Sequence, residues 1–170
     1  ASPWFLDSSR QRLQVAPGET IAACFLAAAR HDPRRVVVAD LKSGTKSYRD
    51  LVTGILALLP SVCKLPGEKL GIMLPASVAA SLAYLTTLFA GRTPVMINWT
   101  VGRRNLEYAL ELSGTEKILT ARALVQKVKQ QGLDLSSIES RLVYLEDLGA
   151  GVTRLEKLLA FVRSRLEWSP

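Results

Sequence analysis

Apolar residues group into short continuous runs, and the segments between the runs place apolar side chains at the three- and four-residue spacing of helices. The runs recur about every 24 residues and are predicted to be buried strands: Leu70–Leu74, Pro94–Ile97, Lys117–Thr120 and Leu142–Leu145. Strand, helix and strand at this spacing indicate right-handed βαβ units. The pattern therefore predicts an α/β fold in three layers, with a mostly parallel sheet covered by helices on both faces.

The first part of the chain predicts a different arrangement. A helix, a strand, a loop, a short polar strand and a longer helix follow one another at Thr20–Arg30, Val36–Ala39, Ser43-Gly44, Lys46-Ser47 and Tyr48–Leu59. Two short strands joined by a glycine-containing loop are typical of a small β-hairpin. Residues 1–16 show no periodic pattern and are predicted to be a linker or an arm, which leaves 17–170 as one α/β subdomain.

Helix ends are marked in the second half of the chain. The helix Arg103–Ser113 stops at Gly114, which suits a left-handed cap. Thr120 is placed to cap a helix over Ala121–Gln131. Before the last helix, Thr153 and Glu156 form a capping-box pattern. The helix has an apolar face made of Leu155, Leu158, Leu159, Val162 and Leu166.

Composition and charge narrow the class of protein. The chain has 170 residues, 48% hydrophobic and 22% charged, as a globular domain has. Its net charge of +7 is spread as +3, +2 and +2 over residues 1–60, 61–120 and 121–170, and aromatic residues make up only 6%. Nucleic-acid binders concentrate basic charge on one element, so no nucleic-acid partner is predicted. An attraction to an acidic protein or an anionic membrane surface stays open.

The sequence favours a cytoplasmic protein without a metal site. Cys24 and Cys63 lie 39 residues apart in apolar stretches and are predicted to be buried free thiols, and His31 is the only histidine. Residues Trp4–Arg12 lack the features of a signal peptide. The longest apolar run, Ala76–Ala90, is shorter than the roughly 20 residues that span a bilayer and is predicted to be a buried helix.

The search for catalytic motifs is negative. Neither a Gly-x-Gly-x-x-Gly pattern nor a Walker loop is present, and three loop-like stretches are interpreted as a turn, a hairpin loop and a helix end: Gly149–Gly151, Ser43–Lys46 and Ser113–Lys117. Glu107 and Glu111 share a helix face with Arg103 and Arg104, which favours a solvated ion-pair surface over an acid/base pair. A second solvated face, without acidic residues, is expected at Arg122, Lys127 and Lys129. No catalytic, cofactor-binding or metal-ligating residue is predicted.

Short motifs nevertheless occur in a recognisable order: Ser47–Leu51, Pro66–Pro75, Ala90–Val95, Asn98 and Ile118–Thr120. Together they resemble the N-terminal part of the acyl-adenylate-forming enzymes, also called AMP-binding ligases. Two further stretches, Ile97–Gly102 and Leu145–Leu148, are most similar to the acyl-acyl-carrier-protein synthetase half of the bifunctional lysophospholipid acyltransferase/synthetase. Ala76 and Lys69 depart from the family pattern, which has Asn and often Asp near these positions.

The resemblance implies the fold of the N-terminal subdomain of such a ligase. The family uses ATP and Mg²⁺ to convert a carboxylic acid to an acyl-adenylate, and then transfers the acyl group to a thiol. For the subgroup, the acid is a fatty acid and the thiol belongs to acyl carrier protein or CoA. The family's Ser/Thr/Gly-rich phosphate loop and its catalytic lysine follow the last helix, so we expect a scaffold fragment that is inactive alone and binds no cofactor. A location in the cytoplasm, on the inner face of the membrane, is compatible with this resemblance.

Four residues of the matching motifs are assigned structural roles. Gly91 allows a tight helix exit, and Pro94 suits the first residue of a strand. Asn98 and Thr100 are expected to cap the next helix or brace the loop after the strand. An incomplete domain should also expose apolar surface near Trp99 and along the last helix, which would drive self-association.

Two alternatives stay open on the sequence. The first is a non-catalytic, flavodoxin-like binding module that acts through its basic surface. The second, a self-contained small α/β enzyme, is disfavoured by the negative motif search.

Overall fold

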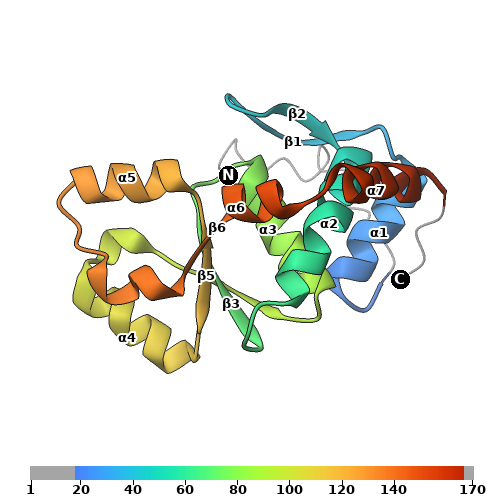
Figure 1. Ribbon diagram of the computed structural model, residues 1–170. Helices are drawn as coiled ribbons and strands as arrows, with labels where there is room; N and C mark the ends of the chain where they lie inside the picture. The colour runs from blue at the N-terminus through green and yellow to red at the C-terminus, as the bar shows by residue number, and fades with distance from the viewer. Residues whose placement is uncertain (1–17, 167–170) are drawn as a thin grey trace, which may run out of the picture.

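The computed structural model describes residues 18–166 (Figure 1). The predicted arm at 1–16 and the segment Trp4–Arg12 lie outside the described residues. Within the described part, the elements of the first third of the chain are α1 (Ile21–His31), β1 (Val36–Asp40), β2 (Gly44–Ser47) and α2 (Tyr48–Cys63). Strands β1 and β2 pair antiparallel and form the predicted hairpin.

The main sheet has four parallel strands, as the sequence predicts. Its strands are β3 (Lys69–Met73), β4 (Thr93–Met96), β5 (Lys117–Thr120) and β6 (Leu142–Tyr144). They lie in the order β4-β3-β5-β6, and Leu70 is paired with Pro94 on one side and with Lys117 on the other. All three pairings are parallel, which requires crossover segments on the faces of the sheet.

Helices cover both faces of this sheet, and the fold therefore has three layers (Figure 1). One face carries α4 (Arg103–Ser113), α5 (Arg122–Gln130) and the 3₁₀ helix η3 (Ser136–Arg141). The other face carries α2, α3 (Val78–Phe89) and α6 (Leu145–Gly151). A second 3₁₀ helix, η2 (Trp99–Val101), follows β4, and the last helix, α7 (Arg154–Leu166), packs on α2.

The two faces of the sheet have separate cores because successive side chains of a strand point in opposite directions. Ile118 and Met73, both fully buried, pack against Leu106 and Leu110 of α4 and Val128 of α5. Their chain neighbours Leu119 and Ile72 pack on the other side against α3. Because both faces are buried, adjacent residues in the middle of β3 and β5 are apolar, without the alternation of a half-exposed strand.

Two helices, α2 and α6, differ most clearly from the predictions. Helix α2 continues past Leu59 and Pro60 to Cys63, because Val62 is buried in the interior and holds the last turn in place. Helix α6 runs through Gly149–Gly151, which was predicted to be a turn. Neither glycine has positive φ, so an ordinary helical backbone accommodates both.

The cysteines also depart from their prediction. Cys24 is half-buried and Cys63 is exposed, although both are free thiols as expected. Cys63 is the last residue of α2, where the helix leaves the interior, so its apolar sequence context did not imply burial. None of the helices in the described part of the chain has the length and apolar character needed to cross a bilayer.

Candidate functional site

The carboxyl edge of the parallel sheet is the first place to look for a ligand. Open α/β sheets bind ligands where the strand order reverses and the crossovers leave on opposite faces. Here the chain leaves β3 toward β4 through α3 and leaves β5 toward β6 through α5, and these two helices lie on opposite faces (Figure 1). The reversal therefore lies between the carboxyl ends of β3 and β5.

A buried side chain closes this position. Thr120, the last residue of β5, is fully buried and its Oγ1 donates a hydrogen bond of 2.9 Å to the carbonyl oxygen of Met73 at the end of β3. The prediction that Thr120 caps the next helix is wrong: α5 begins at Arg122, and its N-cap is Ala121. The hydroxyl is needed across the sheet instead, where it links the two strand ends.

The N-terminus of α3 is occupied by a carboxylate of the hairpin. Asp40, at the end of β1, accepts a 2.8 Å hydrogen bond from the backbone N–H of Val78 in the first turn of α3. It also accepts hydrogen bonds from the backbone N–H groups of Lys42 and Ser43. The N–H groups of Ser43 and Val78 lower the pKa of Asp40. A helix N-terminus can hold an anion, and this one holds the protein's own aspartate.

Replacing Asp40 with asparagine should lower the melting temperature at neutral pH. It should also make the melting temperature less sensitive to acid pH. Because the folded pKa is lowered, the charged carboxylate stabilises the fold above about pH 4 and loses this effect as the pH falls through the folded pKa. The difference in melting temperature between wild type and Asp40→Asn should therefore shrink as the pH falls below about 4. Thermal unfolding followed by circular dichroism measures it, with the exposed Asp32→Asn as control. A difference that stays constant over this range would contradict the role of Asp40.

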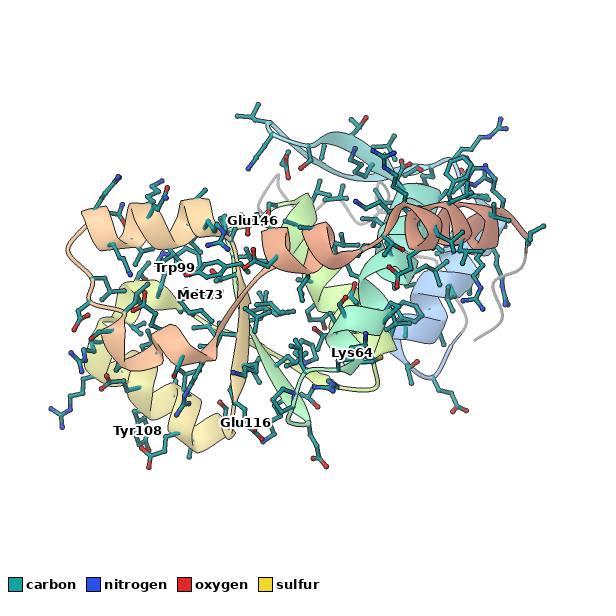
Figure 2. All side chains as sticks on the ribbon, in the orientation of Figure 1. Lys64, Met73, Trp99, Tyr108, Glu116 and Glu146 are labelled. Atoms are coloured by element: carbon teal, nitrogen blue, oxygen red, sulfur yellow. The ribbon has the colours of Figure 1, made fainter. Side chains whose placement is uncertain are left out.

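The start of α5 is likewise satisfied from within the chain. The backbone N–H of Arg122 donates to Glu146 Oε1 at 3.0 Å, and Arg122 Nη2 lies 2.6 and 2.7 Å from the two carboxylate oxygens of Asp147. The guanidinium also lies over the ring of Tyr144, and the hydrogen bond with Asp147 raises the pKa of Arg122. Figure 2 shows Glu146 and Trp99 at the same end of the sheet as Met73. Side chains of α6 thus cover this part of the carboxyl edge.

The basic face of α5 is solvated and carries no acid of its own, as expected, but two of its cations have acidic partners from elsewhere in the chain. Arg122 is paired with Asp147, and Lys129 Nζ lies 2.9 Å from Glu139 Oε1. Both acids come from outside α5. Asp147 lies 25 residues after Arg122, and Glu139 lies 10 residues after Lys129. The spacing of residues within a helix therefore did not predict these pairs.

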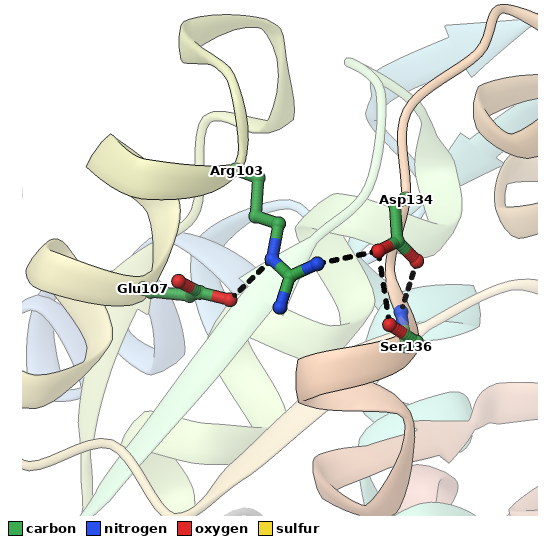
Figure 3. A network of polar contacts seen from close by, with 4 residues as sticks. All are labelled: Arg103, Glu107, Asp134 and Ser136. Atoms are coloured by element: carbon green, nitrogen blue, oxygen red, sulfur yellow. Dashed lines mark hydrogen bonds and ion pairs between the residues drawn. The ribbon is translucent and has the colours of Figure 1, made fainter.

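The predicted ion-pair face of α4 is confirmed and extended (Figure 3). Arg103 Nε lies 2.7 Å from Glu107 Oε1, and Arg103 Nη1 lies 2.6 Å from Asp134 Oδ2. Asp134 in turn accepts hydrogen bonds from the backbone N–H and hydroxyl of Ser136. Hydrogen bonds from Ser137 and Arg103 lower the pKa of Glu107. This network fastens the loop after α5 to the start of α4 and leaves Glu107 a charged partner, not a proton donor.

The four residues that were assigned structural roles from the family motifs, Gly91, Pro94, Asn98 and Thr100, fall into two groups. Asn98 Oδ1 accepts hydrogen bonds from the backbone N–H and the hydroxyl of Thr100, at 3.0 and 2.7 Å, and caps η2 at the carboxyl edge. Gly91 has φ +69° and ends the turn after α3 at the opposite edge. Pro94 is the second residue of β4, not the first as predicted, because pairing with β3 begins at Thr93. The structure thus joins Asn98 with Thr100 but not with the other two.

An apolar groove of 460 Å³ lies between the hairpin, α1 and α3. Phe25, Val38, Tyr48, Tyr84 and Met96 line it. None of the described residues that line the groove is charged, and in the described range 18–166 no three His, Cys, Asp or Glu side chains gather as metal ligands would. The groove can contact apolar groups, and the polar contacts at the carboxyl edge brace loops.

Comparison with known proteins identifies the fold. No family model matches the sequence. Among solved structures, the N-terminal subdomain of Klebsiella oxytoca NpsA superposes with a TM-score of 0.62 at 16% identity, over 78% of this chain and 33% of that chain. The nonribosomal peptide synthetase FmoA3, with α-methyl-L-serine-AMP bound, gives a TM-score of 0.63 at 19% identity over 83% and 16%. The O-succinylbenzoate coenzyme A synthetase MenE from Bacillus subtilis, in complex with AMP, gives 0.58 at 16% identity over 74% and 32%. The chain therefore has the fold of a part of these proteins and spans about a third of the length of each compared chain or less.

Proposed function

We propose that the chain is scaffold for the active site of an ATP-dependent acyl-activating ligase. The whole enzyme would join a carboxylic acid and ATP to give an acyl-adenylate and pyrophosphate, and would then transfer the acyl group to a thiol. The observation that carries the proposal is the shared fold with NpsA, FmoA3 and MenE, two of which are seen with AMP or an acyl-AMP bound. The ordered motifs from Ser47 to Thr120 support it independently.

The contacts at the carboxyl edge support a role as scaffold for this chain, with ATP bound by other residues of the enzyme. The backbone N–H groups of Val78 and Arg122, at the starts of α3 and α5, are engaged by Asp40 and Glu146, so neither of these two donors is left for a phosphate of ATP. Adenylyl transfer needs preorganised donors at the phosphates. We place these donors, the Mg²⁺ site and the catalytic lysine in residues outside 1–170. In this proposal the chain alone binds no cofactor and is inactive.

The substrate class is a finer step of the same proposal. The stretches Ile97–Gly102 and Leu145–Leu148 resemble the acyl-acyl-carrier-protein synthetase subgroup, which favours a fatty acid with acyl carrier protein or CoA as acceptor. Both stretches lie at the carboxyl edge, around η2 and in the first turn of α6.

Exchange of labelled pyrophosphate into ATP tests the proposal. Residues 1–170 should give no exchange with fatty acids of several lengths, whereas the natural protein extended beyond residue 170 should exchange. Loss of a single preorganised donor already costs about a hundredfold or more in rate, so the contrast should be complete. The matched control is the extended chain with the lysine of its phosphate loop replaced.

Two outcomes would contradict the proposal. Saturable, acid-dependent exchange by residues 1–170 would place the chemistry within this chain. A natural extension that lacks a Ser/Thr/Gly-rich loop, or that shows no exchange with any carboxylic acid, would favour the binding module with a basic surface.

A further inference from the structure

Helix α7 packs on the rest of the molecule through small residues. Ala160 and Ser164 are its buried positions, and they face α2. The contact is fixed by a 2.8 Å hydrogen bond between Thr53 Oγ1 and Ser164 Oγ. The start of the helix is fixed by the predicted capping box, in which Thr153 and Glu156 exchange hydrogen bonds. The helix is therefore held in one orientation on the outside of the molecule (Figure 1).

The opposite side of α7 presents its large apolar residues to solvent. At about 100° per residue they fall in one stripe about 100° wide, directly opposite Ala160 and Ser164. The stripe consists of Leu155, Leu158, Leu159, Val162 and Leu166, which are between 41% and 72% exposed. The expectation of exposed apolar surface along the last helix is thus confirmed. Near Trp99 the exposed apolar residues are Met96 and Val101, while Trp99 itself is half-buried against the core.

Both borders of this stripe are basic. Arg163 lies along one border, and Arg154 and Arg165 lie along the other; all three are exposed. The guanidinium of Arg165 lies 3.3 Å from the centre of the Phe161 ring, which holds this charge at the edge of the stripe. Glu156, the only acid of the helix, is engaged in the cap by Thr153.

We propose that α7 docks this molecule on an anionic lipid surface, with the helix in the plane of the membrane. Leucine side chains would enter the boundary between headgroups and acyl chains, while the arginines reach outward to lipid phosphates. A second copy of the chain fits this face less well. Since both borders are basic, either direction of pairing would bring arginines against arginines. The inference does not depend on the proposed ligase activity.

Vesicle sedimentation with residues 1–170 tests this docking. The protein should bind vesicles of equal parts phosphatidylglycerol and phosphatidylcholine and bind pure phosphatidylcholine vesicles much more weakly. Leu155→Gln with Leu166→Gln should lower the partition coefficient about tenfold or more, because two apolar side chains no longer enter the lipid. The matched control replaces Leu41 and Leu112 with glutamine, which are at least as exposed but lie elsewhere, and should bind like wild type.

The charged borders are tested separately. Replacing Arg154, Arg163 and Arg165 with glutamine should lower binding to the anionic vesicles about tenfold or more. Replacing Lys42, Arg104 and Lys127, three exposed cations away from α7, removes the same charge and should have a much smaller effect. Circular dichroism and the melting temperature establish that each variant is folded.

Three results would overturn the inference. The first is wild-type protein that does not bind the anionic vesicles. The second is binding that neither set of α7 substitutions changes. The third is a dimer in sedimentation velocity that the leucine substitutions abolish while vesicles are not bound, which would assign the stripe to a second copy.

Discussion

Replacing Ile118 with alanine should lower the free energy of unfolding by about 2–5 kcal/mol. Ile118 lies in β5, one of the two inner strands, and its side chain is fully buried among residues from α4, α5 and η3. Truncation removes buried methyl groups and leaves a cavity that strands on both sides prevent from collapsing. Urea denaturation followed by circular dichroism measures the change.

The matched control is Ile21→Ala. Ile21 is the first residue of α1 and is 56% exposed, so the same truncation there should change the free energy of unfolding by no more than about 0.5 kcal/mol. Equal effects at both positions would mean that β5 is not the centre of a packed core.

Gly71→Val should be the second most damaging change, with a cost of about 1–3 kcal/mol or more. A Cβ atom at Gly71 would lie 3.1 Å from side-chain atoms of Ile118, Ile97 and Thr115. Valine adds two further methyl groups at this point, where β3 has parallel neighbours on both sides. The side chains must therefore move, or the strand must shift within the sheet.

Gly149→Ala is the control for glycine replacement in general. Gly149 lies in α6 without positive φ, and a Cβ there would meet open space. Alanine should stabilise the fold by about 0.4–1 kcal/mol because it restricts the unfolded chain. If urea denaturation finds Gly71→Val harmless or Gly149→Ala destabilising, the local packing described for these two glycines is wrong.

The parts of the fold that were predictable are those set by local sequence. Lys117–Thr120 was predicted as a strand with the bounds that the structure has, because the apolar pair Ile118-Leu119 follows a helix that ends at Gly114 and recurs at the spacing of the other strands. Arg103–Ser113 and its left-handed cap at Gly114 were predicted for the same reason. At Pro60 the local rule failed, because burial of Val62 in the interior outweighs the hydrogen bond that proline removes.

The side-chain partners were the part that sequence reasoning missed. Asp40 binds the start of α3 from 38 residues away, and Thr120 binds Met73 from 47 residues away. Neither distance has a periodic signature, since the contact depends on which strand lies beside which. A polar residue at the end of a buried strand was the available signal, and at Thr120 it was interpreted as a helix cap.

Pro94 has a consequence for the behaviour of the protein at high concentration. Strand β4 is an edge of the sheet, and the N–H groups of Thr93 and Ile97 donate inward, to the carbonyl oxygens of Glu68 and Ile72. By alternation, position 94 faces outward, where proline offers no donor. If a second molecule added a strand at this edge, the hydrogen-bond ladder between the two strands would lack its first donor, at Pro94. The open edge is therefore a poor template for cross-β growth, and a proline at the second position of this strand limits aggregation.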